Sequence, residues 1–271
     1  MSYRSNVHTH TTFCDGENTP EEMVKRALEL GYVSLGFSSH AYSPDGDDWC
    51  LLPKNEIAYR DEILRLKEKY SDKIEIYLGI EKDVFSEEIA FQPEYVIGSL
   101  HYIYIGGKYH AVDLSEEITE NTVNEVFGGN WYAYAEAYYE TAAKAAELTG
   151  CDIVGHFDLV TKFNEGFKHF DETDIRYRTA AIDALRYEAQ KCNLFEINTG
   201  AIARGKRTTP YPAPFLLSEM KRLGCEVIIT GDSHSVQGLS CAYDQAAELA
   251  KSAGYRYCKI LRGGKFENIA L

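Results

Sequence analysis

Short apolar runs rich in β-branched residues alternate with longer segments of helical periodicity along almost the whole chain. This alternation is typical of βα units, whose strands lie parallel in one sheet that the helices cover. The chain has 271 residues and no Pro-, Gly- or Ser-rich linker, which favours one closed barrel over two domains. We therefore predict an α/β fold with a single domain over residues 1–271. Strands are expected near 5–10, 34–39, 74–81, 95–101, 152–156, 194–198, 226–231 and 256–262.

Helices are expected between these strands. The first is signalled by TPEE at 19–22, a capping box with proline at the first helical position, and Gly31 is expected to end it. The stretches 41–54, 102–130 and 199–212 interrupt the alternation, and the second contains the hairpin-like YIYIGGKYHAVDL. Because long loops of a compact domain usually carry binding groups, we expect ligand contacts there. The other helices are expected at 55–70, 131–150, 174–191, 213–224 and 241–254.

Composition excludes several classes of protein. The longest hydrophobic runs, such as EVIITG, are too short to span a bilayer, and the N-terminus lacks the features of a secretory signal, so a cytoplasmic location without a membrane partner is expected. The seven cysteines are scattered and never spaced CxxC, which predicts reduced thiols. The formal net charge of −14 disfavours nucleic acid as a partner. The oligomeric state is left open.

Six of the eight histidines lie at or just after the end of a predicted strand, and so do the glutamate of YLGIE and the aspartate of ITGD. Because the carboxyl ends of parallel strands open on one face of a barrel, these side chains should meet at one mouth. One strand-end histidine alone would be an ordinary buried residue, but the whole set in register favours a metal site. The set is His8, His10, His40, Glu81, His101, His156, Asp232 and His234. The other two histidines, His110 and His169, are expected in loops as solvated residues.

The spacing of these residues constrains the metals. His8 and His10 are two residues apart, as are Asp232 and His234, and side chains two apart on a strand point to the same face. Imidazoles and carboxylates without a required thiolate suit zinc, iron or manganese better than calcium or magnesium alone. Together with Asp15 the set is too large for one tetrahedral centre and sufficient for two or three ions. Such a cluster suits phosphate-ester hydrolysis.

The successive motifs resemble those of the PHP (polymerase and histidinol phosphatase) superfamily, in the same order along the chain. In addition, FEINTGAIARGKRTTPYP at 195–212 is similar to the EINT…R…PYP segment of the monofunctional L-histidinol-phosphate phosphatases in this superfamily. The motifs are HTHTTFCDG at 8–16, SSH at 38–40, GIE at 79–81, SLH at 99–101, GH at 155–156 and GDSH at 231–234.

The resemblance implies a distorted (β/α)₇ TIM-like barrel with three divalent metal ions. Glu81 would bridge the first and second ions. Some family members have histidine at the position of Asp15, a departure that can shift the metal preference of the third site. The implied ligands are His8, His10, Glu81 and Asp232 for the first ion, Glu81, His101 and His156 for the second, and Asp15, His40 and His234 for the third.

The activity that the resemblance implies is hydrolysis of the small-molecule phosphate ester L-histidinol phosphate in histidine biosynthesis, by a hydroxide that bridges two ions and attacks phosphorus in line. Asp232 or His234 could protonate the leaving alkoxide, and Glu81 is counted with them as catalytic. Basic groups should complete the phosphate site. The candidates are Arg204, Lys206 and Arg207. Each could instead be a solvated loop charge without a phosphate contact, and this alternative is stronger for Lys206 and Arg207 than for Arg204.

Alternative interpretations remain at this point. The loop PDGDDW offers Asp45, Asp47, Asp48 and Trp49 to the ammonium and imidazole of the substrate, although acidic turn residues are usually just solvated. The chain could instead be a PHP phosphoesterase acting on a nucleotide, a cyclic phosphodiester or an oligonucleotide, or a catalytically silent PHP module. An amidohydrolase also begins with HxH, but its binuclear form commonly has a bridging lysine where this chain has a glutamate.

Overall fold

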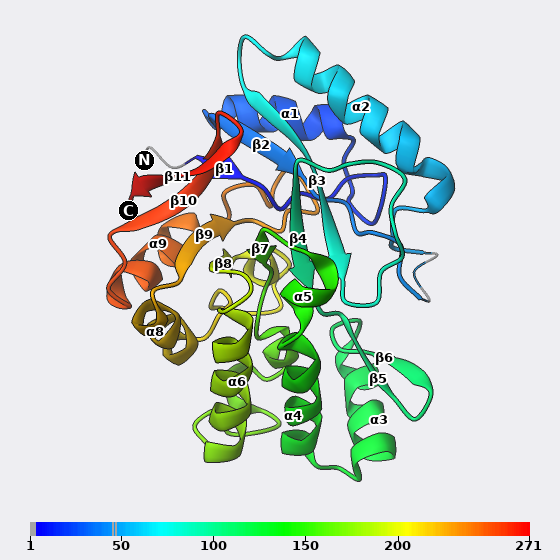
Figure 1. The fold of residues 1–271 in the computed structure, drawn as a ribbon, viewed down its shortest axis with the longest axis vertical. Helices are drawn as coiled ribbons and strands as arrows, with labels where there is room; N and C mark the ends of the chain where they lie inside the picture. Colours follow the sequence, from blue (N-terminus) through cyan, green and yellow to red (C-terminus); the bar gives the residue numbers. More distant parts are fainter. Residues whose placement is uncertain (1–3, 45, 47) are drawn as a thin grey trace.

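The computed structural model describes residues 4–44, 46 and 48–271, and a curled sheet of parallel strands organises them (Figure 1). Neighbouring strands of this sheet follow one another in chain order, apart from a separate two-stranded hairpin. Each expected strand is present, though several are shorter than expected. The strands are β1 (Ser5–Asn6), β2 (Ser34–Phe37), β3 (Glu75–Asp83), β4 (Tyr95–Ser99), β7 (Ile153–Val154), β8 (Leu194–Asn198), β9 (Glu226–Thr230) and β10 (Tyr257–Arg262).

The sheet closes where the chain continues beyond β1 and β9. The amide of His10 donates to the carbonyl of Ser233 at 2.9 Å, and the amide of Ser233 donates to the carbonyl of His8 at 3.0 Å. These bonds form a parallel bridge between Thr9 and Ser233. The parallel strands from β1 to β9 thereby make the predicted distorted (β/α)₇ barrel. Beyond β9 the sheet is extended by β10, which is parallel to β9, and by β11 (Lys265–Ala270), which is antiparallel to β10 and was not predicted.

Helices pack on the outer side of the sheet (Figure 1). The predicted capping box opens the first of them, since the Thr19 hydroxyl accepts from the Glu22 amide at 3.3 Å and the Thr19 amide donates to the Glu22 carboxylate at 2.8 Å. The helix expected at 131–150 is two helices, α4 and α5. The helices are α1 (Pro20–Glu29), α2 (Glu56–Lys69), α3 (Glu116–Phe127), α4 (Trp131–Ala142), α5 (Ala145–Thr149), α6 (Ile175–Glu188), α7 (Gly200–Ala203), α8 (Pro214–Leu223) and α9 (Tyr243–Ser252).

The stretch 102–130 differs most from expectation. It begins with the anticipated hairpin, β5 (Tyr102–Ile105) and β6 (Lys108–Ala111), and continues into helix α3, which was expected to be loop. The Ser115 side chain caps α3 by accepting from the Ile118 amide at 3.2 Å, and Gly128 ends the helix in the left-handed region. Hairpin and helix lie side by side at one edge of the molecule (Figure 1).

The interior of the barrel is filled beneath the mouth by a tyrosine from β4. The hydroxyl of Tyr95 shares its one proton between the carbonyls of Val7 and Phe37, 2.5 Å and 3.0 Å from its oxygen, and so links β4 to β2 and to the residue after β1. A Cβ atom at Gly36 or Gly79 would lie 2.4 Å and 2.2 Å, respectively, from the nearest atom of this side chain. The two glycines therefore make the room that the ring occupies, and the ring closes the floor of the barrel.

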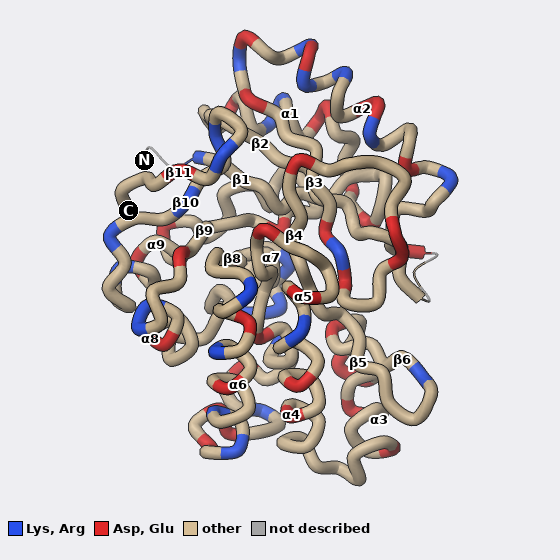
Figure 2. The backbone as a smooth tube through the Cα atoms, in the orientation of Figure 1, with Lys and Arg blue, Asp and Glu red and all other residues tan. Residues whose placement is uncertain are grey.

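Charged side chains of both signs are interspersed along the outer helices (Figure 2). On α2, for example, Arg65 pairs with Glu62 at 2.7 Å and with Glu21 of α1 at 3.0 Å. These side chains are partly or largely exposed, so each pair contributes little to stability.

A buried carboxylate on the outside of the barrel predicts a pH-dependent stability. Glu188 of α6 accepts from the amide of Ala146 at 2.6 Å, its other oxygen has no hydrogen-bond partner among the described residues, and burial raises its pKa to about 8. Because this pKa is higher folded than unfolded, its contribution to stability is present below pH 4.5 and is lost as the pH rises toward 8. Relative to Glu188→Gln, the wild type should lose ~2–4 kcal/mol of unfolding free energy between pH 5 and 8. Urea denaturation of both proteins at pH 5 and pH 8 measures the two unfolding free energies. A difference between the two proteins that is the same at both pH values would contradict the prediction.

Candidate metal centre

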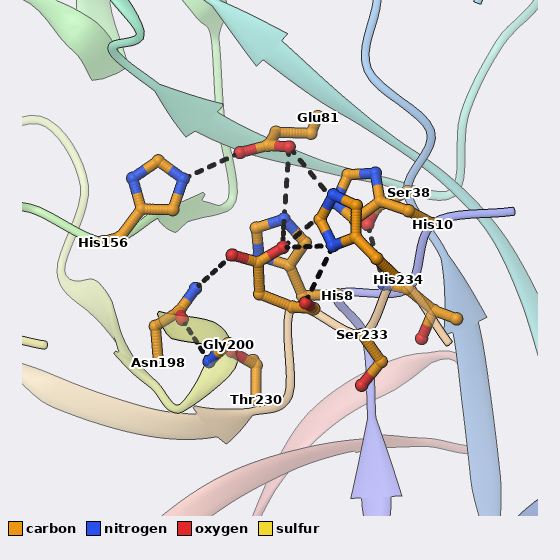
Figure 3. Close-up of polar contacts among 12 residues, drawn as sticks. His8, His10, Ser38, Glu81, His156, Asn198, Gly200, Thr230, Ser233 and His234 are labelled. Atoms are coloured by element: carbon orange, nitrogen blue, oxygen red, sulfur yellow. Dashed lines mark hydrogen bonds and ion pairs between the residues drawn. The ribbon is translucent and has the colours of Figure 1, made fainter. Parts of the chain in front are cut away.

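The strand ends meet at one mouth of the barrel, where a cavity of about 240 Å³ opens. All nine side chains that the sequence singles out as metal ligands come from the carboxyl end of a strand or from the loop after it. Figure 3 shows His8, His10, Glu81, His156 and His234 among them. Three of them, His8, His10 and Glu81, are fully buried beneath the cavity. The other six line its wall: Asp15, His40, His101, His156, Asp232 and His234.

Eight of these nine side chains, all except His156, form overlapping groups that could hold metal ions. In each group, one ligand atom from every member lies within 4.8 Å of the others. Since His10 and His40 each belong to two groups, the groups are parts of one continuous cluster. The groups are His8, His10 and Asp232; His40, Glu81 and His101; and His10, Asp15, His40 and His234.

Glu81 lies at the centre of the cluster, and its two oxygens face different histidines. Oε2 lies 3.2 Å from His8 Nε2 and 2.8 Å from His40 Nδ1. Oε1 lies 3.0 Å from His156 Nε2 and 3.6 Å from His101 Nε2. A carboxylate in this position can contribute one oxygen to each of two neighbouring ions.

Unsatisfied buried atoms indicate that the residues fit a cation. Nε2 of His8, Nε2 of His10 and Oε2 of Glu81 are buried without a hydrogen-bond partner among the described residues. The glutamate oxygen is 3.2 Å and 3.5 Å from the two nitrogens, and Asp232 Oδ1 is 3.3 Å from His10 Nε2. Such orphaned atoms are costly in a folded protein, and a divalent ion between them would remove the cost. Two imidazoles and two carboxylates form a donor set that zinc, iron and manganese accept.

The ends of the cluster nearest solvent are arranged around Asp15. Its Oδ2 lies 3.2 Å from His234 Nε2, and its Oδ1 lies 3.6 Å from His40 Nε2. The His10 ring stacks on the rings of both His40 and His234, with each centroid 4.1 Å from its own, and the centroids of those two rings are 6.0 Å apart. The side chains of Asp15, His40 and His234 can therefore converge on one further ion.

Electrostatics keep two of the ligands, His10 and Asp232, in their binding forms. Burial, together with His234 and His40, lowers the pKa of His10 well below its usual value, so this imidazole is neutral. Burial acts to raise the pKa of Asp232, but the Arg204 guanidinium and neighbouring histidines hold it well below its usual range. A neutral imidazole and an ionised carboxylate are the forms that bind metals.

The backbone at Asp232 is shaped to bring its side chain to the cluster. Asp232 has φ 42°, in the left-handed region that a residue with a side chain rarely adopts. A Cβ atom at Gly200 would lie 2.7 Å from the Asp232 Cβ, so glycine is needed opposite this turn. The Asn198 amide group, on β8, donates to Asp232 Oδ2 at 3.3 Å (Figure 3). Strain of this kind is typical of functional positions.

Of the three predicted phosphate contacts, only Arg204 lines the metal cavity. Its Nη2 donates to Asp232 Oδ2 at 3.0 Å, and its Nη1 lies 2.6 Å from His234 Nδ1. Lys206 is exposed and lines a neighbouring hollow of about 340 Å³. A guanidinium beside the ligands can meet a phosphate bidentately.

Arg207 departs from the sequence-based expectation. Its Nη1 donates to the carbonyl and the hydroxyl of Thr161 at 2.7 Å and 2.6 Å, and its guanidinium lies over the ring of Tyr211, 4.8 Å from the centroid. The side chain is buried and borders a different hollow, formed with α8 residues. Because its donors are already engaged, Arg207 connects loops behind the site and does not face the cavity.

Several residues that line the cavity were missed or only weakly indicated by the sequence. Lys162 Nζ donates to the carboxylate of Asp113 at 2.9 Å, and both border the cavity. Trp49 and Tyr102 add aromatic rings, and the indole lies 4.8 Å from the His40 ring. The TK pair that shortly follows GHFD could have indicated Lys162, but nothing in the sequence indicated that Asp113 lies beside it.

The remaining candidates lie away from the cavity or outside the described part. Asp48 is exposed and does not line the cavity, while Asp45 and Asp47 lie outside the described residues. His110 is in strand β6, not in a loop. His169 is half-buried instead of solvated, since its Nε2 lies 2.7 Å from a Glu116 oxygen and its ring stacks on Trp131.

The closed α/β barrel with a histidine–carboxylate cluster at its mouth defines a class of metal-binding barrel proteins. The chain belongs to the PHP domain family, whose model matches residues 6–200.

The chain is also similar over most of its length to individual relatives. A probable histidinol-phosphatase of Schizosaccharomyces pombe is 26% identical over 94% of this chain and 89% of that protein. One of Deinococcus radiodurans is 27% identical over 92% and 93%. The crystal structure of the Lactococcus lactis histidinol phosphate phosphatase, complexed with zinc, L-histidinol and phosphate, has a TM-score of 0.70 at 23% identity and covers 98% of this chain and 99% of that one. This likeness confirms the fold.

Proposed function

We propose that the chain is a metal-dependent phosphomonoester hydrolase that converts L-histidinol phosphate and water to L-histidinol and phosphate. The observation that carries the proposal is the cavity itself, where one arginine stands directly against a cluster of histidines and carboxylates. The proposal is supported by relatives named probable histidinol-phosphatase that match more than nine-tenths of this chain.

We propose three divalent ions at this site, with zinc, iron and manganese as candidates. Zinc in the complexed Lactococcus lactis protein supports zinc among them. When bound, the ions would lower the pKa of water and offset charge on the phosphoryl oxygens. The proposed ligands are His8, His10, Glu81 and Asp232 for the first ion, Glu81, His101 and His156 for the second, and Asp15, His40 and His234 for the third.

The chain's own groups would orient the phosphate and move the proton. Arg204 reaches the cavity from the loop after α7 and would bind two phosphate oxygens through its fork. Asp232 and His234 lie within 3.4 Å of one another beside this arginine. We propose that one of them orients a water molecule that protonates the leaving alkoxide.

The rest of the cavity suits the organic part of the substrate. Burial acts to raise the pKa of Asp113, but Lys162 and His101 hold it well below its usual range, so this carboxylate is charged and can attract an ammonium group. Trp49 and Tyr102 offer ring faces to an imidazole.

Replacing Asp113 should therefore affect one substrate more than another. We expect Asp113→Asn to raise KM for L-histidinol phosphate about 10-fold, because an attraction of about 1.4 kcal/mol is lost, and to leave KM for p-nitrophenyl phosphate nearly unchanged. Steady-state kinetics on both substrates measure the difference. Equal changes for the two esters would show that Asp113 does not recognise the ammonium group.

A substrate panel tests the proposed function against its rivals. Metal-loaded protein is given L-histidinol phosphate, a nucleoside monophosphate, a cyclic phosphodiester and a short oligonucleotide, and kcat/KM is compared. We expect kcat/KM to be higher for L-histidinol phosphate by about 100-fold or more, because a site that hydrogen-bonds polar groups of its substrate discriminates against compounds that lack them. Preference for a nucleotide or diester would overturn the assignment, and no turnover of any compound would favour a silent PHP module.

Location and partners are part of the proposal. None of the helices found in residues 4–44, 46 and 48–271 has the length and apolar content that a membrane crossing needs. The seven cysteines, all within the described part, are free thiols, which supports the cytoplasm as the proposed location. The net charge of −14 supports a small-molecule phosphate ester over nucleic acid as the partner.

A further inference from the structure

A second buried glutamate lies behind the metal cluster, and no ligand role is proposed for it. Glu196 is on β8 and is 1% exposed. Its two oxygens have four partners: Oε1 lies 2.6 Å from His8 Nδ1 and accepts from the hydroxyl of Thr230, while Oε2 accepts from the amide of His156 at 2.8 Å and from the side-chain amide of Asn198 at 2.9 Å. Both oxygens are thus fully engaged inside the barrel.

The partners of Glu196 require that both of its side-chain oxygens accept hydrogen bonds. The backbone amide of His156 can only donate. Asn198 must present its NH₂ group to Glu196, because its carbonyl oxygen accepts from the amide of Gly200 at 2.8 Å. A carboxylate accepts at both oxygens, whereas a carboxamide would turn a donor toward one pair of donors.

The contact with Glu196 also determines which nitrogen of His8 faces the cluster. With Nδ1 donating to Glu196, the lone pair of His8 is on Nε2, which lies 3.2 Å from Glu81 Oε2 and 3.7 Å from Asp232 Oδ1. A carboxylate behind a histidine in this way orients the ring and increases its basicity toward a metal.

The other oxygen of Glu196 acts on the second proposed metal position. It fixes the backbone of His156, whose Nε2 lies 3.0 Å from Glu81 Oε1. Asn198 extends the connection, because the same NH₂ group reaches Asp232 Oδ2 at 3.3 Å. One buried carboxylate therefore holds a ligand from each side of the Glu81 bridge.

We propose that Glu196 is a positioning residue that couples the first and second metal positions, by fixing the tautomer and orientation of His8 and the backbone of His156 at the same time. The inference rests on the metal centre of the proposed function. It predicts that loss of the carboxylate weakens the binding of two ions together and leaves the binding of the third, at Asp15, His40 and His234, unchanged. The reason is that Glu196 contacts none of these three side chains in the interactions found among the described residues.

The test is the zinc stoichiometry and affinity of Glu196→Gln in metal-buffered equilibrium dialysis, with elemental analysis of the protein. For the wild type we expect three ions. For the variant we expect two of them to bind about 10- to 100-fold more weakly and one to bind as in the wild type. Glu188→Gln is the matched control, because it also replaces a buried glutamate with glutamine but lies outside the cluster, and it should bind zinc like the wild type. Wild-type affinity at all sites in Glu196→Gln would overturn the inference.

A second measurement on the unaltered protein covers the case in which Glu196→Gln does not fold, as judged by circular dichroism. In the zinc-loaded wild type, ¹⁵N NMR should show His8 protonated at Nδ1 and bound to metal through Nε2. Metal bound at Nδ1 of His8 would overturn the inference. Neither readout uses turnover, so a protein that binds three zinc ions in the expected way but releases no phosphate would refute the proposed function and leave this inference intact.

Discussion

Glu81→Gln is expected to lower kcat for L-histidinol phosphate by about 1,000-fold or more, because a carboxamide cannot give a charged oxygen to each of two ions. The two oxygens of Glu81 face different histidines, 2.8–3.2 Å away on one side and 3.0–3.6 Å on the other. Removing this one charge therefore affects both positions that it connects. The measurement is steady-state phosphate release together with the metal content of the same sample.

A matched control for this variant is available on the same strand. Glu75 is at the opposite end of β3 and interacts with Tyr77 and Gly263, away from the mouth. Glu75→Gln should keep wild-type kcat within about 2-fold, as is usual for positions outside a site. Near-wild-type activity of Glu81→Gln, with the fold intact by circular dichroism, would contradict the bridging role.

Arg204→Met is expected to lower kcat/KM by about 100- to 1,000-fold, the usual effect of removing a preorganised charged donor from a reacting group. The guanidinium is 3.0 Å from Asp232 and lines the cavity, so the variant loses the phosphate contact and leaves a buried carboxylate without its partner. Thermal melting with and without metal should accompany the kinetics, because the unpaired Asp232 carboxylate also affects stability.

The neighbouring cations provide the comparison for Arg204. Arg207→Met should lower the melting temperature, because it removes two hydrogen bonds to Thr161, while kcat/KM changes by less than about 3-fold. Lys206→Met, at an exposed position, should change kcat/KM by a similarly small factor. A larger loss of kcat/KM for Arg207→Met than for Arg204→Met would reverse the assignment of the phosphate contact.

The fold could be predicted well where the signal is local. Strand β8 was predicted with its exact bounds, because the apolar residues Leu194, Phe195 and Ile197 stand between a polar helix end and the loop 199–212. Helix α3 was missed because its sequence, EEITENTVNEVF, has few apolar residues, and it buries mainly Thr119, Thr122 and Val123. The bridge between Thr9 and Ser233 joins the two ends of the barrel and has no local signal at all.

The site shows the same division between local and distant signals. The candidate ligands could be found because parallel strands deliver their ends to one face, so position along the chain implies position in space. Glu196 could not, because in FEINTG it reads as one residue of a buried strand, and its partner His8 is 188 residues away. Arg204 and Arg207 are three residues apart in one loop, and only the contacts of the folded loop distinguish their roles.

We infer that this PHP barrel hydrolyses L-histidinol phosphate with the aid of three metal ions. The direct measurement is phosphate release from L-histidinol phosphate while zinc or manganese is titrated into protein stripped with a chelator. We expect no turnover without metal and activity that rises until about three equivalents are bound, as the donor set at the mouth allows. Turnover by the metal-free protein, or a metal-loaded protein that releases no phosphate, would contradict this inference.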